Sequence, residues 1–253
     1  MQILKPYIIE LAPTLSGHWY KVWKQKDNGG KGKLLGVFPS STTILNAYPQ
    51  SQFLTKWIAD NGWNESQRLK SEAGEQGTKI HTATDILEDG QELVRQDFSL
   101  EEWFKISSFV SWYNDYQPIL IAKEFPIFSP KGKYCGRLDR IYSISGVITL
   151  LDIKSGSGIH EHFPLQFASY AKAIEEITDL EIAQTACLQL GAQNKNCYRY
   201  VIYPEWREHY KVFENVRAVW QYEYFDSKKK EKEVPVLELP STLKLEIKKP
   251  IAL

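Results

Sequence analysis

Apolar residues recur with two different periods along the chain, and their order gives a first outline of the fold. Near the N-terminus, apolar and polar residues alternate over His18–Lys24 and Lys33–Phe38, on either side of the glycine-rich segment 27–32. This alternation, interrupted by such a segment, predicts a β-hairpin. Capping residues and helical periodicity then predict helices that begin near Pro39–Thr43, cover Glu65–Glu88 and begin again at the Ser99–Glu102 capping box.

From Ile119 onward the pattern changes to the two-residue period of β-strands. The expected strands are Ile119–Phe128, Tyr134–Ile144 and Val147–Lys154, separated by short turns rich in Gly, Pro and Ser. These strands are followed by a helix from Pro164 to about Ile177, strands at Thr185–Gly191 and Tyr198–Tyr203, and an amphipathic helix at about Glu205–Phe225. This order predicts an α/β fold in which helices flank a central mixed β-sheet that contains an antiparallel three-strand meander.

The same order divides the chain into three parts. Residues 1–64 hold the N-terminal hairpin and a helix, and residues 65–225 form the core. Residues 226–253 are expected to be a C-terminal appendage that carries the basic cluster Lys228–Lys232. Such a cluster is more often a solvated loop than a phosphate contact.

Composition restricts the setting more than the activity. The chain has 31 basic and 31 acidic residues, so it lacks the overall basic excess of many nucleic-acid-binding proteins, although a local basic groove is compatible with neutrality. No apolar stretch approaches the ~20 residues that span a bilayer, and the N-terminus has no features of a signal peptide. The three scattered cysteines predict neither a disulfide framework nor an iron–sulfur cluster. We expect a cytoplasmic protein without a membrane partner.

Acidic residues fall at matching positions of the three predicted meander strands. If the second turn of the meander has two residues, Asp139 lies opposite Asp152; if the first has four, Glu124 lies opposite Asp139. The period of two then places Lys154 on the same face as Asp152. A slip of one residue in either turn would send a carboxylate to the other face.

Carboxylates that face each other destabilise a sheet, so a row of three favours a functional role over a purely structural one. Oxygen ligands gathered in this way suit Mg²⁺ or Mn²⁺, and Lys154 could hold an attacking water or a phosphate oxygen. The constellation predicts metal-assisted hydrolysis of a phosphodiester. The alternative is that each acid is an exposed strand residue or an ion-pair partner of Arg137 or Arg140.

Five short motifs occur in a recognisable order: Pro39–Leu45, Gly77–His81, Glu124 with Gly136–Asp139, Asp152–Lys154, and Gln166–Tyr170. Together they resemble the core of the PD-(D/E)XK nuclease superfamily, with its αβββαβ arrangement, and in particular its RecB-like exonuclease branch. The first motif is similar to the Pro-Ser-x-Thr opening of phage and mitochondrial single-strand DNA exonucleases. The resemblance covers residues 36–203, and it departs from the usual pattern at Leu138, where proline is common.

The resemblance implies roles for individual residues. Ligands of Mg²⁺ or Mn²⁺ would be His81, Asp139, Asp152 and the backbone carbonyl of Ile153. The catalytic groups would be Lys154, Asp152 and the additional acid Glu124. Residues that bind or orient the substrate would be Gln166, Tyr170, Ser40, Thr42 and Thr43. For the last three, hydroxyl and backbone N–H groups at a helix start could contact a phosphate, and plain helix capping is an equal alternative.

Aromatic residues are interleaved with cations in the N-terminal part. The aromatic residues are Trp19, Tyr20, Trp23, Trp57 and Trp63, and the neighbouring cations are Lys21, Lys24 and Lys56. Rings among cations suit stacking on unpaired bases, whereas packing in the core explains most tryptophans. The N-terminal part is therefore expected to contribute DNA contacts.

These observations predict a divalent-metal-dependent deoxyribonuclease, and specifically an exonuclease acting on single-stranded DNA or DNA ends. A recombination or replication protein is an expected partner. Two alternatives stay open. The first is a non-catalytic nucleic-acid-binding module on the same fold, and the second is a structure-specific endonuclease of the same superfamily.

Overall fold

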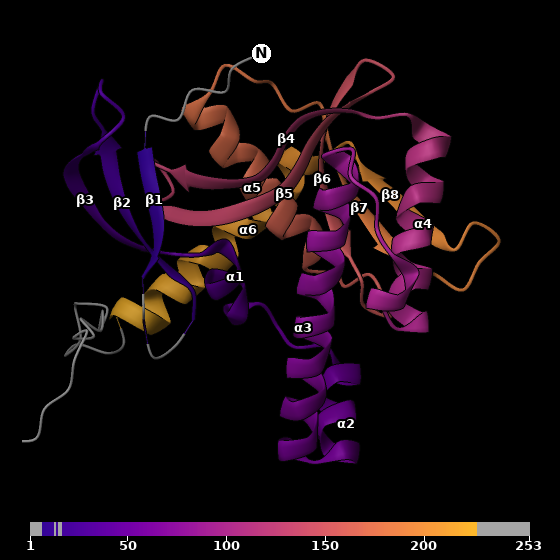
Figure 1. The fold of residues 1–253 in the computed structure, drawn as a ribbon. Coiled ribbons are helices and arrows are strands. Elements are labelled where there is room, and N and C mark those ends of the chain that lie inside the picture. Colours follow the sequence, from indigo (N-terminus) through magenta and orange to yellow (C-terminus); the bar gives the residue numbers. More distant parts are fainter. Residues whose placement is uncertain (1–6, 13, 15–16, 227–253) are drawn as a thin grey trace, which may run out of the picture.

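The computed structural model describes residues 7–12, 14 and 17–226 of the 253-residue chain. The expected C-terminal appendage with Lys228–Lys232 lies, from residue 227 on, outside the described residues. The described chain is an α/β protein with one antiparallel and one mixed β-sheet, and helices flank the mixed sheet (Figure 1). No described helix is both long and apolar enough to cross a membrane.

The smaller sheet has three antiparallel strands in the order β1-β2-β3 and forms one end of the molecule (Figure 1). The strands are β1 (Tyr7–Ala12), β2 (Trp19–Gln25) and β3 (Lys31–Pro39). The predicted hairpin is confirmed as β2 and β3, and β1 is an additional strand that pairs with β2. Ser40 then caps α1 (Ser41–Ile44), because its hydroxyl accepts a hydrogen bond from the Thr43 amide.

The larger sheet contains the predicted meander. Its order is β4-β5-β6-β7-β8, and its strands are β4 (Ile119–Ser129), β5 (Tyr134–Ile144), β6 (Val147–Lys154), β7 (Gln184–Leu190) and β8 (Tyr198–Tyr203). All neighbours are antiparallel except β6 and β7, which are parallel and are connected through α5 (Phe163–Ile177). A parallel pair needs such a crossover, so the mixed sheet follows from the order of the elements.

Both turns of the meander have the expected lengths. Ser145 and Gly146 have φ values of 51° and 83°, as a two-residue hairpin turn with both central residues left-handed requires, and Ile144 pairs with Val147. Ser129 pairs with Tyr134 across the four-residue first turn. The register of the sheet is therefore the one that aligns the acidic residues.

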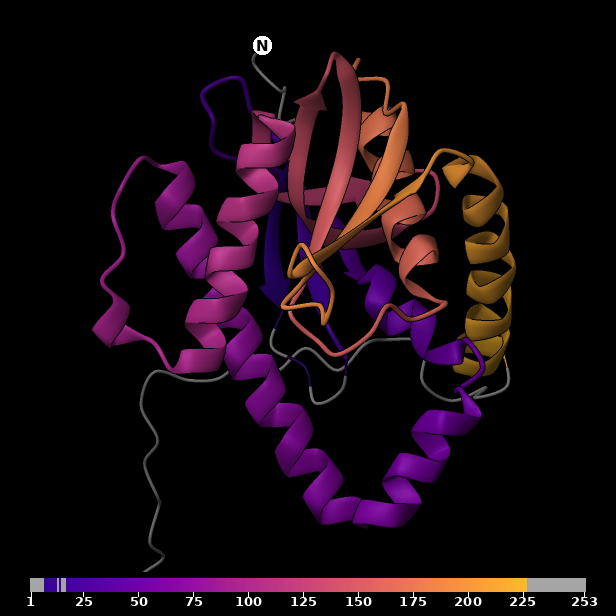
Figure 2. The same ribbon diagram turned by 90° about the vertical axis from the view of Figure 1, so that its right-hand side faces the viewer.

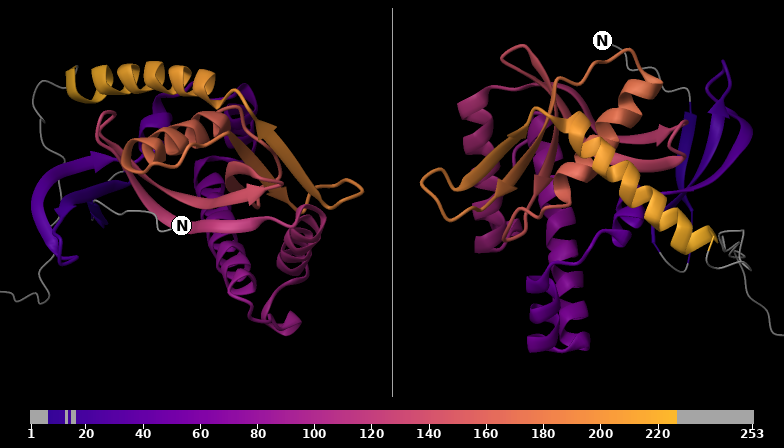
Figure 3. Two further views of the ribbon diagram at one scale, coloured as in Figure 1. Left: turned by 90° about the horizontal axis from the view of Figure 1, so that it is seen from above. Right: turned by 180° about the vertical axis from the view of Figure 1, so that it is seen from behind.

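Helices cover both faces of the larger sheet (Figure 3). On one face, α3 (Trp63–Glu88) and α4 (Leu100–Tyr116) enclose an apolar cluster that includes Ile80, Trp112 and Leu151. On the other face, α5 and α6 (Trp206–Gln221) enclose a larger one. The predicted capping box at Ser99 and Glu102 is present at the start of α4.

A pair of helices projects away from the sheets (Figures 1 and 2). It consists of α2 (Gln52–Asn61) and the first half of α3, and we call residues 52–75 the helical arm. Helix α2 was not predicted, and none of its residues is buried. Gly62, with φ 79°, separates the two helices. The short helices η1 (Leu45–Ala47), η2 (Arg95–Asp97) and η3 (Tyr222–Asp226) complete the described elements.

Gly136 in β5 provides a direct test of how α5 packs on the sheet. A Cβ atom at this position would overlap the ring of Tyr170, which is buried in α5. We expect Gly136→Ala to lower the free energy of unfolding by about 1–3 kcal/mol, the usual cost of overpacking a core. Urea denaturation measures the change. Gly158→Ala is the matched control, because no atom lies within 4 Å of its added Cβ; equal stability of the two variants would contradict this packing.

Candidate active site

Two of the acidic residues lie where β5 and β6 stop pairing. The ladder between β5 and β6 runs to the pair Arg140↔Leu151, so Asp139 and Asp152 stand one residue beyond its last pair. On the other side of β5, the flanking pairs bring Glu124 of β4 level with Asp139. The structure thus places all three acids on adjacent strands at one level of the sheet.

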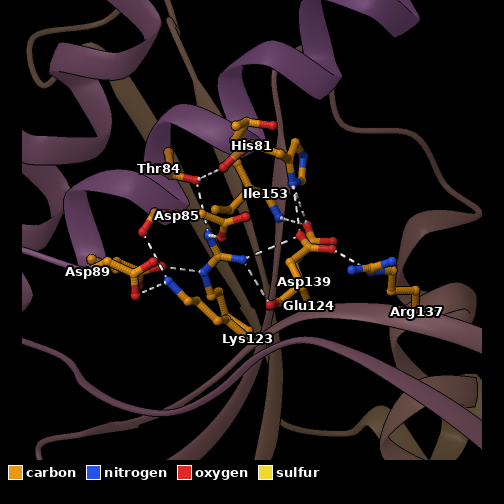
Figure 4. A network of polar contacts seen from close by, with 12 residues as sticks. His81, Thr84, Asp85, Asp89, Lys123, Glu124, Arg137, Asp139 and Ile153 are labelled. Carbon is orange, nitrogen blue, oxygen red and sulfur yellow. Dashed lines mark hydrogen bonds and ion pairs between the residues drawn. The ribbon is translucent and has the colours of Figure 1, made fainter. Parts of the chain in front are cut away.

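Helix α3 adds a histidine to this group (Figure 4). The Nδ1 atom of His81 lies 3.6 Å from Asp139 Oδ2 and 3.8 Å from Glu124 Oε1. One ligand atom from each of these three residues lies within 4.8 Å of the others. Gly77, one turn before His81, leaves the helix surface bare beside the site, since its added Cβ would meet only the Ser155 hydroxyl.

Glu124 occupies an unfavourable backbone conformation. Its φ is 46°, in the left-handed region that residues other than Gly, Asn and Asp rarely adopt. Its carboxylate accepts a hydrogen bond from Arg137 Nε at 2.7 Å and lies 3.5 Å from Arg140 Nη1. The contacts with Arg137 and Arg140 restrain the side chain of Glu124. Strained backbone conformations of this kind cluster at functional sites.

Asp152 and Lys154 form the second half of the site. The Lys154 ammonium lies 2.5 Å from Asp152 Oδ2, and the Asp152 side chain is only 2% exposed. The same ammonium lies 4.8 Å from the centre of the Phe163 ring and 5.6 Å from that of Phe167, so two aromatic rings flank its charge. Ile153, between them, donates its backbone N–H to Asp139 Oδ2 at 2.8 Å. This bond ties β6 to the carboxylate of β5.

The charges at the site shift one another's pKa values. Burial raises the pKa of Asp139, the Asp152 carboxylate raises it further, and the result is about 6. Burial lowers the pKa of His81, but the nearby carboxylates, Asp139 first, outweigh it and raise that pKa to about 9. Burial also lowers the Lys154 pKa, and Asp152 and Asp139 more than restore it, so the net direction is upward. The carboxylates and the two basic side chains therefore interact strongly with one another.

A buried arginine, which sequence reasoning did not assign to the site, holds α3 against the sheet. The Arg140 side chain is 0% exposed and its guanidinium contacts Asp85 and Glu88 of α3. It also donates to the Thr84 hydroxyl, and the Tyr142 hydroxyl donates to Glu88. A signal was available in the sequence, because residues 81, 85 and 88 share one face of a helix.

An open cleft of about 360 Å³ leads to this group. Its lining residues are Gly74, Gly77, Thr78, His81, Glu124, Arg137 and Asp139. Sequence reasoning treated Arg137 only as an ion-pair partner for the acids. The structure places its side chain at the cleft, 60% exposed, on the far side of Glu124 from Asp85 and Asp89 (Figure 4).

Gln166 and Tyr170 lie beneath the site and contact each other. Gln166 Nε2 donates to the Tyr170 hydroxyl at 3.0 Å, and both residues are buried. Burial and the nearby Asp152 carboxylate raise the Tyr170 pKa. With so little exposed surface, the two residues suit orientation of the site better than direct contact with a substrate.

The hydroxyl residues at the start of α1 are largely engaged with the protein itself. Ser40 caps the helix, and Thr43 donates its hydroxyl to the His18 carbonyl at 3.1 Å. Thr42 is exposed and lies 2.8 Å from the Ser40 hydroxyl. Of the three, Thr42 alone keeps open surface for an external ligand.

The N-terminal tryptophans divide into two groups. Trp19 is buried against Trp220 and Tyr224, so the suggestion that it stacks on bases is wrong: the ring fills the core between β2 and α6. Trp57 and Trp63 lie on the helical arm and are 39% and 67% exposed. They remain available for stacking, as does half-buried Trp23, which has the Lys31 ammonium 4.3 Å from its ring centre.

The donor set fits a hard divalent cation. Carboxylate oxygens and one imidazole nitrogen are gathered within the range that a shared ion requires, and a second carboxylate pair, Asp139 and Asp152, is close enough to repel. His81, Glu124 and Asp139 would hold such an ion, and Asp152 lies on the neighbouring strand at the same level of the sheet. For Ile153, the contact with the site is made by its N–H, which donates to Asp139 Oδ2.

Comparison of the chain with protein-family models and with curated protein sequences found no match. The resemblance to the nuclease superfamily therefore depends on the motifs and on the site geometry described above.

The buried Arg140 yields a stability prediction. Arg140→Met would leave Glu88, 1% exposed at its side chain, without a cation, so we expect unfolding free energy to fall by about 3–5 kcal/mol. Chemical denaturation followed by tryptophan fluorescence measures this loss. Arg68→Met is the control, since Arg68 pairs with Glu65 and Glu72 on an exposed helix surface and should shift the midpoint little. Similar losses of stability in both variants would contradict the role of Arg140 in holding α3 against the sheet.

Proposed function

We propose that the protein is a divalent-metal-dependent deoxyribonuclease with a PD-(D/E)XK-like core, and that it acts as an exonuclease on single-stranded DNA or DNA ends. One observation carries the proposal. His81, Glu124 and Asp139 converge within 4.8 Å on neighbouring elements, beside a buried Asp152–Lys154 ion pair. Carboxylates placed this close together lower the stability of the fold, so their grouping favours a functional role.

The order of elements supports the same class. Helix α3 supplies His81, the meander β4-β5-β6 supplies the acids and the lysine, and α5 supplies Gln166 and Tyr170 before β7. Apart from η2 and α4, which lie between α3 and β4, this order corresponds to the αβββαβ arrangement that the resemblance implies. The support is geometric, and it comes from residues that lie far apart in the chain.

In the proposed reaction, each group acts through its position. Asp139, Asp152 and His81 would hold a divalent cation, which would supply charge to polarise the phosphate and to lower the pKa of a bound water. Lys154 orients the water or a phosphate oxygen, and its ion pair with Asp152 fixes the ammonium. Glu124, which Arg137 holds through Nε, would accept the water's proton.

A single strand is favoured as the substrate by the helical arm. Trp57 and Trp63 present exposed rings there, and unpaired bases stack on such rings without regard to sequence. A DNA substrate would place the activity in the DNA-containing cytoplasm or nucleoid, where a recombination or replication protein is the expected partner. The non-catalytic binding module and the endonuclease stay as alternatives that the following experiment separates.

Substitution at the Asp152–Lys154 pair tests the catalytic proposal. We expect Asp152→Asn and Lys154→Ala each to reduce Mg²⁺-dependent release of nucleotides from end-labelled single-stranded DNA by at least ~100-fold, because each removes a preorganised charge. Lys211→Ala, on the exposed surface of α6, should keep full activity.

The substrate separates the alternatives. An exonuclease releases nucleotides from linear DNA and leaves a circular single strand intact, whereas an endonuclease cuts both. DNA binding without cleavage in either Mg²⁺ or Mn²⁺ would identify a non-catalytic module. Full activity of Asp152→Asn or Lys154→Ala would contradict the assignment of the site.

A further inference from the structure

Arg137 stands at the cleft with most of its hydrogen-bonding capacity unused. Of its five N–H donors, the one on Nε is given to Glu124 Oε2 at 2.7 Å. The guanidinium is 60% exposed, and the ion pair with Glu124 restricts its orientation. No described residue accepts a hydrogen bond from the terminal Nη atoms, so they can donate to a ligand in the cleft.

The other cations near the site are committed elsewhere. Arg140 is buried and donates through all three guanidinium nitrogens to Glu88, Asp85, Thr84 and the Asp139 carbonyl. Lys154 pairs with Asp152, and Lys123 with Asp89. Among the described residues that line the cleft, Arg137 is the one permanent cation.

A phosphate entering this cleft meets the carboxylates of Glu124 and Asp139 and needs a compensating charge beside them. A guanidinium binds phosphate oxygens in a bidentate manner, with a geometry that a lysine ammonium lacks. The bare helix surface at Gly74 and Gly77 forms the opposite wall, where an added Cβ meets nothing or a single hydroxyl. This wall leaves room for a chain to lie between α3 and Arg137.

We propose that Arg137 is a phosphate-binding residue that holds one backbone phosphate of a single nucleic-acid strand in the cleft. Glu124 positions the guanidinium through Nε, and the Nη atoms bind the phosphate. The inference rests on the proposed function for its substrate class, and it goes beyond it by assigning the residue that positions the strand.

Binding is measured in the Lys154→Ala background, so that cleavage does not consume the probe. The probe is a fluorescent single-stranded 12-mer in Mg²⁺, followed by anisotropy over a range of salt concentrations. We expect Arg137→Gln to weaken binding about tenfold and to reduce the slope of log K against log salt by about 0.7, the loss of one phosphate contact on a single strand. The affinity of Arg137→Lys should lie between the two, because lysine keeps the positive charge but cannot bind a phosphate in a bidentate manner.

The matched control is Arg207→Gln. Arg207 is also an exposed arginine paired with a glutamate, Glu175 at 3.0 Å, but it lies on α6 away from the cleft. Its replacement should change neither affinity nor salt slope. Circular dichroism and the thermal midpoint establish that each variant remains folded.

Neutral linkages distinguish phosphate binding from a role in which Arg137 only supports Glu124. A methylphosphonate is placed at one linkage of the 12-mer at a time. In the Lys154→Ala protein, we expect the methylphosphonate at one position of the 12-mer to weaken binding about tenfold. In the protein that also carries Arg137→Gln, the same methylphosphonate should have no further effect, because the contact is already lost. The inference would be overturned if the methylphosphonate had the same effect at every position with and without Arg137→Gln. It would also be overturned if Arg137→Gln left the salt slope unchanged. Because wild-type cleavage is measured separately, failure of the proposed reaction would leave this binding result interpretable.

Discussion

Repulsion among carboxylates at the end of the meander is the constraint around which the site is organised. Asp139 and Asp152 stand beyond the last β5–β6 pair, and their proximity is one reason why the Asp139 pKa rises to about 6. Cations compensate from three directions: Lys154 beside Asp152, the arginines beside Glu124, and the His81 imidazole above Asp139. Carboxylate oxygens gathered in this way are the donors that a hard divalent cation prefers.

Helix α3 converts this local chemistry into a larger architecture. Arg140 binds α3 through Asp85 and Glu88, one and two turns after His81, so the buried ion pairs set the position of the imidazole. The same continuous helix extends outward into the helical arm with its exposed tryptophans (Figure 2). Helix α3 therefore connects the helical arm with the site as one continuous element.

The meander and its acidic row could be predicted because their determinants are local. The turn at Ser145-Gly146 fixes the register by its length, and alternation fixes the face. Strand β1 escaped prediction because it is short and is defined by pairing with β2. For α2 a signal was available, because its apolar residues recur at helical spacing at positions 53, 54, 57 and 58, although none of them is buried. The partners of Arg140 and the exposure of Arg137 depend on how α3 docks on the sheet, which no local pattern encodes.

The most direct measurement of the central claim is the position of a bound Mn²⁺ ion, located by anomalous diffraction from crystals of the protein grown with Mn²⁺. The account predicts a strong anomalous peak within ~2.5 Å of a carboxylate oxygen of Asp139 and of Asp152, with His81 as a neighbouring ligand. Full Mn²⁺ occupancy at a different place, with these side chains turned away from one another, would contradict it.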